Sequence, residues 1–480
     1  MPGVIVRTAT RSGPVNPTVP ASGRYFVVGQ FDRGRTDVAQ QVRSLAELEV
    51  LYGGRVAYGS AYDDLRMFFE EGGTEAYVIR VVGPAATKGT LSVNNGAGSP
   101  APALRVDALS AGAWSAGVKV TVAVGTLPDT FKVIVDGPLE SDTETYDNLA
   151  TAADAVGALT RSRYVRGVDL GAGVPAPMAA TALSAGSDDR ASVTASTMGD
   201  ALAKFGKEYG AGAVAIPGYT SALVGSALMA HAKEFRRLAL MAAAQGASDA
   251  DYLNAADTLI GLDGEYGGLF GPWVSIPMGG GRTKLVSPEG YVAAARARAH
   301  LSEGPWRAPA GELAIARFVV GVERELTRAQ GDTLDEGHVS AIRTIAGTTR
   351  LYGWRSLSSD VDNYALLVGR DVLNTVAYEA EARLEPYVFR TIDGKGQLLA
   401  SVASTLVGIL DPMRAAGGLY ERTVDGQQVD PGYSVDVGPT VNTDAVLAAN
   451  KVAAVVALRV SPVGTLIDLT IVKAGLTATV

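Results

Sequence analysis

The sequence contains no cysteine and only three histidines among its 480 residues. The absence of cysteine excludes disulfide bonds, thiolate metal sites and cysteine nucleophiles. His231, His300 and His338 show no H-x-x-x-H spacing, so the common histidine-based zinc site is missing as well. We expect these three histidines to be solvated or to cap helices. Stability must then come from packing or from assembly with other chains.

Long apolar runs and an excess of positive charge are also missing. The longest apolar stretches, such as 238–244 and 452–458, fall far short of the about 20 residues that cross a bilayer, and the N-terminus lacks the apolar core of a signal peptide. With 42 basic and 50 acidic residues the formal net charge is −8, which argues against a general nucleic-acid binder. The sequence predicts a soluble protein made in the cytoplasm, with no nucleic-acid partner and no membrane insertion.

No nucleotide-binding or catalytic motif is complete. The chain lacks G-x-x-x-x-G-K-[ST], and no G-x-G-x-x-G lies between a predicted strand and a helix. The three glycines at 279–281 follow a strand, but no helix begins directly after them, which favours a plain turn. The segment 113–117 (Ala-Trp-Ser-Ala-Gly) resembles a nucleophile elbow, but Ala113 replaces the first glycine. We predict no catalytic, cofactor-binding or metal site, and no enzyme activity.

Apolar periodicity predicts alternating strands and helices along much of the chain. The first unit has a strand at 24–29, helices at 44–52 and 62–71, and a strand at 75–82. From 190 to 302 the pattern continues with helices at 192–209, 221–236, 249–260 and 288–301, and strands at 213–217, 238–243 and 270–277. Such alternation is typical of a mostly parallel sheet covered by helices.

Residues 84–185 interrupt this alternation. They are rich in Gly, Pro, Ser, Thr and Asn, and contain short strand-like pieces at 118–124 and 131–135. We predict a β-rich domain inserted into the α/β core and lying outside it. The final third has long helices at 371–385 and 397–416.

Both ends of the chain read as short strands. Val4, Ile5 and Val6 precede a segment with prolines at three-residue spacing, and a strand near the C-terminus carries Ile467, Leu469 and Ile471 on one side. Such strands can pair with their own domain or with the sheet edge of a neighbouring subunit. The sequence pattern alone leaves both readings open, an ordinary edge strand or a link in a polymer.

Several short motifs in the same order resemble those of the sheath subunit of contractile phage tails and related injection machines. The most specific is 68–81, Phe-Phe-Glu-Glu-Gly-Gly-Thr-Glu-Ala-Tyr-Val-Ile-Arg-Val. The others are Pro2-Gly3-Val4, Phe26 to Gly34, Tyr52-Gly53-Gly54, Ile216-Pro217-Gly218, Pro272-Trp273, Gly304 to Ala310, Tyr352 to Leu357, and Asn442-Thr443-Asp444. The region 84–185 matches poorly.

This resemblance implies a fold and a domain arrangement. The fold class is α/β (α+β overall), with a helix-covered mixed sheet, a β-rich inserted domain and terminal strands exchanged between subunits. The expected divisions are an N-terminal arm at 1–20, a core at 21–83 plus 186–350, an insert at 84–185, and an inner C-terminal domain at 351–480 that ends in an exchanged strand at 464–480.

The resemblance also implies a function without nucleotide hydrolysis. Sheath subunits form stacked six-membered rings around an inner tube and contract to drive the tube through a cell envelope. Expected partners are further copies of the chain, the tail tube protein, and baseplate and tail terminator proteins. Arg383, Arg390 and Lys395, at and after the end of helix 371–385, are candidates to face the tube. The expected location is a phage virion assembled in the host cytoplasm and used for viral genome ejection. The alternatives are a bacteriocin or injection particle and, more distantly, a nucleotide-binding α/β enzyme.

Overall fold

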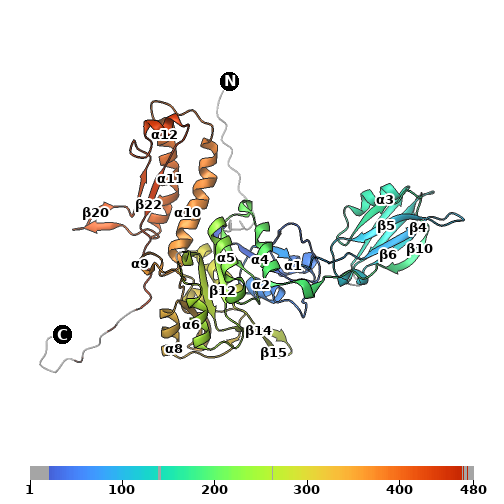
Figure 1. Cartoon of the computed structure of the whole chain (residues 1–480), viewed down its shortest axis with the longest axis horizontal. Coiled ribbons are helices and arrows are strands. Elements are labelled where there is room, and N and C mark those ends of the chain that lie inside the picture. Colours follow the sequence, from blue (N-terminus) through green and yellow to red (C-terminus); the bar gives the residue numbers. More distant parts are fainter. Residues whose placement is uncertain (1–20, 139–141, 262, 467–468, 470–472, 474–480) are drawn as a thin grey trace, which may run out of the picture.

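The computed structural model describes residues 21–138, 142–261, 263–466, 469 and 473. Three parts are visible in Figure 1: a central α/β core, a β-rich domain that projects from one side, and a helical C-terminal part that projects from another. The expected strands at Val4, Ile5 and Val6, and at Ile467 and Ile471, lie outside the described residues.

The core is built on an eight-stranded mixed sheet with the order β18-β17-β13-β12-β11-β1-β3-β2. Six neighbouring strands are parallel, and β2 and β18 are antiparallel at the two edges. The strands are β1 (Tyr25–Gly29), β2 (Gln40–Val42), β3 (Ala76–Arg80), β11 (Gly212–Ala215), β12 (Arg237–Ala242), β13 (Gly267–Gly271), β17 (Val339–Ile345) and β18 (Thr348–Leu351). The predicted mostly parallel, helix-covered sheet is confirmed.

Alternate residues of each strand enter two different cores, because successive side chains point to opposite faces of a sheet. Tyr25 and Val27 of β1 join one core, and Phe26 and Val28 join the other. The first face is covered by α1 (Leu45–Tyr52), α2 (Ala61–Glu70) and α7 (Glu289–Ser302). The second is covered by α4 (Ala195–Asp200), α5 (Ser221–Phe235), α6 (Asp249–Asp257) and α8 (Arg328–Glu336).

Residues 90–182 form two antiparallel sheets with a hydrophobic core of their own. The sheets have the orders β10-β6-β7-β8 and β4-β5-β9. Their elements are β4 (Thr90–Asn94), β5 (Pro102–Ala108), β6 (Lys119–Val124), β7 (Phe131–Asp136), β8 (Thr143–Leu149), α3 (Ala152–Leu159), β9 (Val165–Asp169) and β10 (Met178–Ala182). We refer to this part as the insert.

The C-terminal part is dominated by two long antiparallel helices, α10 (Val368–Leu384) and α11 (Gln397–Ala415). Leu398, Val402, Leu406 and Ile409 of α11 form a small core with Leu384 of α10 and neighbouring residues. The remaining elements are α9 (Val361–Tyr364), β19 (Arg422–Val424), β20 (Gln427–Asp430), β21 (Tyr433–Asp436), α12 (Asp444–Ala448) and β22 (Val455–Leu458). By length and composition α11 is apolar enough to cross a membrane, but its apolar side packs inside this domain.

Two predicted elements differ from the structure. The helix expected at 192–209 breaks after α4 into short 3-10 turns, because Phe205 and Gly206 leave the helical conformation. Buried Arg237 donates to the carbonyls of both residues at 2.7 and 2.8 Å, which satisfies the backbone at the break. The strand expected at 270–277 is split between β13 and β14 (Val274–Gly279), since Pro272 lacks the N–H that would continue the ladder. Strand β14 enters a separate sheet with β15 (Arg282–Val286) and β16 (Gly321–Val322).

Candidate functional site: the joints of the projecting domains

The candidate chemical residues of the sequence are structural in this fold. Ser115 is buried and its Oγ accepts a hydrogen bond from the N–H of Gly186 at 2.9 Å. The glycines at 279–281 form the exposed turn between β14 and β15. Among the described residues, no group of three or more His, Cys, Asp or Glu side chains could hold a metal ion.

The expectation for the histidines was wrong in two cases, because His231 and His300 are buried at 5% and 3% exposure. Burial, together with the charge of Arg237, lowers the pKa of His231 to about 3. The neutral ring therefore accepts a hydrogen bond from Arg237 at its Nε2, over 2.7 Å. His338 is half-buried and lies 2.8 Å from the Ser356 carbonyl through Nδ1.

Neighbouring elements make close contacts at the carboxyl ends of β1 and β11, where sheets of this kind often bind ligands. The strand order reverses between β1 and β11, since β1 is followed by β3 on one side and β11 by β12 on the other. In open α/β sheets, ligands usually bind at the carboxyl ends of the strands at such a point. A Cβ on Gly29, at the end of β1, would lie 2.2 Å from Cβ of Ala61 in α2. On the β11 side, the N–H of Gly218 donates to Ser287 Oγ at 3.2 Å. The start of α2 and the segment before α7 therefore pack closely against the chain at the ends of β1 and β11.

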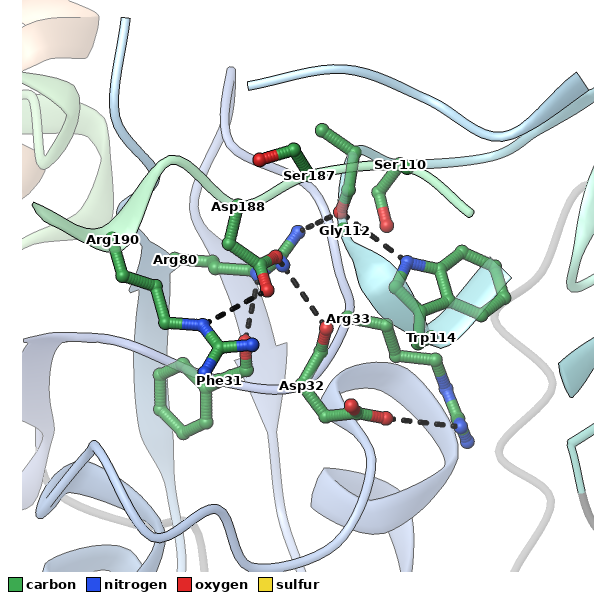
Figure 2. A network of polar contacts seen from close by, with 12 residues as sticks. Phe31, Asp32, Arg33, Arg80, Ser110, Gly112, Trp114, Ser187, Asp188 and Arg190 are labelled. Carbon is green, nitrogen blue, oxygen red and sulfur yellow. Dashed lines mark hydrogen bonds and ion pairs between the residues drawn. The ribbon is translucent and has the colours of Figure 1, made fainter. Parts of the chain in front are cut away.

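A buried ion pair joins the insert to the core (Figure 2). Arg80, at the end of β3, is fully buried and donates to Asp188 Oδ1 at 2.5 Å. The same guanidinium donates to the carbonyls of Phe31 and Asp32, both at 3.0 Å, and to that of Ala111 at 2.8 Å. Burial lowers the pKa of Arg80, and the charge of Asp188 opposes this shift. One side chain therefore holds a core loop, the insert and the segment that returns from the insert.

The two linkers between core and insert are paired with each other. Thr87 and Ser187 exchange backbone hydrogen bonds at 2.9 and 3.0 Å, and Gly83 donates to the Asp188 carbonyl at 2.9 Å. Close approach needs glycine here, since a Cβ on Gly83 would lie 2.1 Å from the Asp189 carbonyl oxygen. We call residues 83–89 and 184–189 together the linker ribbon. It gives the insert a fixed attachment rather than two loose tethers.

A cavity of about 880 Å³ lies beside the linker ribbon, between core and insert. Its basic side chains are Arg35, Lys88, Arg163 and Arg166. Three of them already bind neighbouring acceptors, which are Asp37 for Arg35, Glu144 for Arg163 and the Ser162 carbonyl for Arg166. Arg166 donates only to neutral carbonyl groups and no ion pair is formed by Lys88 among the described residues, so these two side chains keep positive charge at the cavity.

A second buried ion pair joins the C-terminal part to the core. Arg296 of α7 donates to Asp371 Oδ1 of α10 at 2.5 and 3.0 Å, and also to the carbonyl of Ser22. Burial alone would raise the pKa of Asp371, but the charge of Arg296, with help from His300, outweighs it and the pKa is lowered. The start of α10 and the residues that follow the N-terminal arm therefore meet at one buried point.

Of the three tube-facing candidates, Arg383 lies near the end of α10, and Arg390 and Lys395 lie in the loop 385–396 that joins α10 to α11. Arg383 is half exposed and pairs with Glu379 at 2.8 Å, one turn earlier. Arg390 lies over the ring of Tyr387, 5.0 Å from its centre. Lys395 is exposed. The loop forms the end of the C-terminal projection away from the core (Figure 1). Of the proposed exchange residues, the structure describes Leu469, which is 75% exposed.

Sequence reasoning missed both buried ion pairs. Arg80 follows Val78 and Ile79 in an apolar strand, and a charged residue at such a position is a signal for a buried partner. Asp188 and Asp371 carried no comparable signal, since one lies in a polar turn and the other in the first turn of a helix.

Comparison with known proteins places the fold. No protein-family model matches the sequence, and no curated protein is similar to it. A crystal structure of a sheath tail protein from Listeria innocua matches with a TM-score of 0.63 at 13% identity, covering 87% of this chain and 89% of that one. The helical sheath of the anti-feeding prophage in its contracted state matches with a TM-score of 0.55 at 15% identity, covering 98% and 99%. The contracted sheath complex of an extracellular contractile injection system matches with 0.57 at 12% identity, again covering 98% and 99%. The chain therefore has the fold of the sheath tail proteins of contractile systems.

Proposed function

We propose that this chain is the structural subunit of a contractile sheath, which polymerises as stacked six-membered rings around an inner tube. The observation that carries the proposal is the fold match over 98% of this chain and 99% of sheath subunits, which includes both projecting parts as well as the core. Contraction of such a polymer drives the tube through a cell envelope. Further copies of the chain, a tube protein, and baseplate and terminator proteins are its partners.

The sheath works without nucleotide hydrolysis in this proposal. The close contacts of Ala61 and Ser287 with the chain at the ends of β1 and β11 support it, together with the absence of a complete nucleotide-binding motif in the sequence. The energy for contraction is then stored when the extended sheath assembles. The same observations count against the distant alternative, a nucleotide-binding enzyme.

Neighbouring subunits are linked by their terminal strands. Val4, Ile5 and Val6 at one end and Ile467, Leu469 and Ile471 at the other are the proposed exchange residues. A strand of seven residues adds about five to six backbone hydrogen bonds at roughly 1 kcal/mol each, and each covered aliphatic side chain adds about 1.5–3 kcal/mol. Even after ordering costs, a link of several kcal/mol at every subunit results.

The tube-facing surface includes Arg383, Arg390 and Lys395. A contact that holds the extended sheath but separates during contraction favours exposed ion pairs, which contribute only about 0–1 kcal/mol each. The exposure of Arg383 and Lys395 at the end of the C-terminal projection supports this choice.

The particle is a phage tail assembled in the host cytoplasm, or a bacteriocin or injection particle. The match to an extracellular contractile injection system over 98% of the chain supports the second of these, a bacteriocin or injection particle, as the alternative to a phage tail. Purified particles separate the two, since a virion carries encapsidated DNA for genome ejection and an injection particle does not.

A sedimentation assay tests the proposal itself. The purified chain, in buffer treated with apyrase to remove nucleotides, should pellet as a polymer, and tube protein from the same gene cluster should pellet with it. Polymer that requires ATP, or a chain that stays in the supernatant at all concentrations, would contradict a nucleotide-independent sheath.

A further inference from the structure

The cavity between core and insert carries positive charge that its acidic neighbours do not balance. Among the described residues of its wall, four are basic and one, Asp37, is acidic. Asp37 pairs with Arg35 at 2.6 Å. Arg163 pairs with Asp142 at 2.5 Å and with Glu144 at 3.1 Å. The other two basic side chains of the wall form no ion pair within the described part of the chain.

Arg166 of β9 is the first of these two. Its Nη1 donates to the carbonyls of Leu159, Ser162 and Val165, over 3.3, 2.6 and 2.7 Å. These bonds fix the guanidinium at the end of α3 and leave Nε and Nη2 without a hydrogen bond to the described residues. The Nε and Nη2 groups form a planar fork that can bind two oxygens of one phosphate or carboxylate. Arg166 is therefore held in place with one side of its guanidinium free for an anion.

Lys88 brings the second charge from the linker ribbon. The backbone on both sides of it is fixed, since Thr87 pairs with Ser187 and the Gly89 carbonyl accepts from the N–H of Ala108 at 2.8 Å. The side chain of Lys88 is exposed and lines the cavity. Two cations without acidic partners match the charge of about −1.5 to −2 that a phosphate monoester carries at pH 7.

The wall also offers hydroxyl and amide groups. The side chains of Thr36 and Gln40, on the core side, form no hydrogen bond with the described residues. Ser110 is 6% exposed, and its Oγ accepts from the N–H of Gly34 at 3.2 Å. The hydroxyl proton of Ser110 is thus available to a ligand. Such groups can bond to the hydroxyl groups of a sugar.

The size and composition of the cavity indicate a ligand larger than a bare ion. Its volume of about 880 Å³ lies in the range of about 300–1,000 Å³ that is typical of small-molecule sites. Val50 and Leu51 of α1 supply an apolar side, against which the C–H groups of a sugar ring can pack. The described lining residues include no aromatic side chain, and nucleotide bases commonly stack on aromatic rings. The wall therefore fits a phosphorylated sugar better than a nucleotide or free phosphate.

We propose that the cavity between core and insert binds a sugar phosphate, whose phosphate group lies between Lys88 and Arg166. The sugar hydroxyl groups bond to Thr36, Gln40 and Ser110. Because these residues come from the core, the linker ribbon and the insert, the bound ligand holds the insert against the core. The site is separate from the proposed self-assembly, since none of the described lining residues belongs to the terminal segments or to the tube-facing set.

Equilibrium dialysis of the full chain tests the site, because it counts bound ligand whether or not the chain polymerises. Radiolabelled glucose 1-phosphate or glucose 6-phosphate should bind at about one molecule per chain, and glucose should not bind. Lys88→Gln should weaken binding about tenfold, since a charge-assisted hydrogen bond is lost. Lys119→Gln is the matched control, because it removes the same charge at an exposed position of β6 outside the cavity. Binding of neither sugar phosphate, or equal binding by the two variants, would overturn the site.

A second variant separates the sugar from its phosphate. Gln40→Leu removes the amide and leaves both cations, so it should weaken sugar phosphate binding about fivefold, as expected for one neutral hydrogen bond, and leave the binding of inorganic phosphate unchanged. Gln427→Leu, at an exposed position of β20, is the control. If inorganic phosphate or glucuronate binds as tightly as the sugar phosphates, or AMP binds more tightly, the cavity takes a different anion and the proposal fails.

Discussion

Arg80 and Asp188 form a 2.5 Å ion pair in the interior, although 107 residues, including the whole insert, separate them in the sequence. Arg80 closes the last core strand before the insert, and Asp188 lies in the segment that returns from it. The orientation of the insert relative to the core is therefore set at a single buried point, which the linker ribbon reinforces.

Loss of the Asp188 charge should loosen the linker ribbon. In Asp188→Asn the guanidinium of Arg80 stays buried without a counter-charge, which typically costs about 3–5 kcal/mol. Amide hydrogen exchange of residues 83–89 and 184–189 should become faster by about 100-fold, the factor that roughly 3 kcal/mol represents. Asp129→Asn, at an exposed position of the insert, is the matched control, because asparagine tolerates the left-handed φ of 58° there. Equal exchange in both variants would contradict a central role of the ion pair.

The insert should be dispensable for folding and polymerisation. Ser184 donates to the Thr90 carbonyl at 2.9 Å, so the two chain ends of the insert lie side by side. Replacing residues 91–183 by a short Gly-Ser turn keeps Arg80 and Asp188 and removes a domain with its own core. We expect a soluble chain that still pellets as polymer. An insoluble or unfolded product would mean that the core depends on the insert.

Because Asp371 is ionised in the folded chain, the stability of the fold should fall at acid pH. Its pKa is lowered in the folded chain, so its ionised form stabilises the fold above the unfolded value of about 4, and this contribution is lost as the pH falls through the folded pKa. Asp371→Asn should lower the melting temperature clearly at pH 7, since Arg296 loses its partner, and the difference from wild type should shrink near pH 3. Asp362→Asn, on the exposed helix α9, is the control. A difference that does not change with pH would argue against this ion pair.

Reversing two charges should weaken the hold on the tube. Arg383→Glu with Lys395→Glu reverses two of the three exposed cations of the proposed tube-facing surface and leaves Arg390 in place. Co-sedimentation with purified tube protein should fall, while polymerisation without tube is unchanged. Arg422→Glu with Lys451→Glu, at exposed positions elsewhere in the same domain, serves as the control. If tube binding is unchanged, the contact with the tube lies on another surface.

Removing the terminal segments should abolish the polymer without unfolding the subunit. Deletion of residues 1–20 or of 464–480 takes away the proposed exchange strands, while both buried ion pairs remain. Each truncated chain should run as a folded monomer in size-exclusion chromatography with a normal circular dichroism spectrum. Normal polymer from both truncations would show that the linkage lies elsewhere.

Local sequence signals predicted the regular elements well. The helix predicted to begin at Ser44 is α1, and Ser44 caps it, with its Oγ accepting from the Glu47 N–H at 3.2 Å. The strand–helix alternation gave the core sheet, and apolar alternation gave β6 and β7 of the insert. These features depend on neighbours within a few residues, which a single sequence reveals.

The attachments of the insert and of the C-terminal part to the core depend on residues far apart in the sequence. They could not be predicted from local patterns. The break near Gly206 is satisfied by Arg237, about 30 residues later, and the attachment of α10 by Arg296, 75 residues earlier.

Negative-stain electron microscopy of the purified wild-type chain tests the central claim most directly. A sheath subunit should form hollow tubes with regular cross-striations from stacked rings, in the absence of any nucleotide. Compact particles of the size of one or a few chains, at every protein and salt concentration tried, would contradict the account.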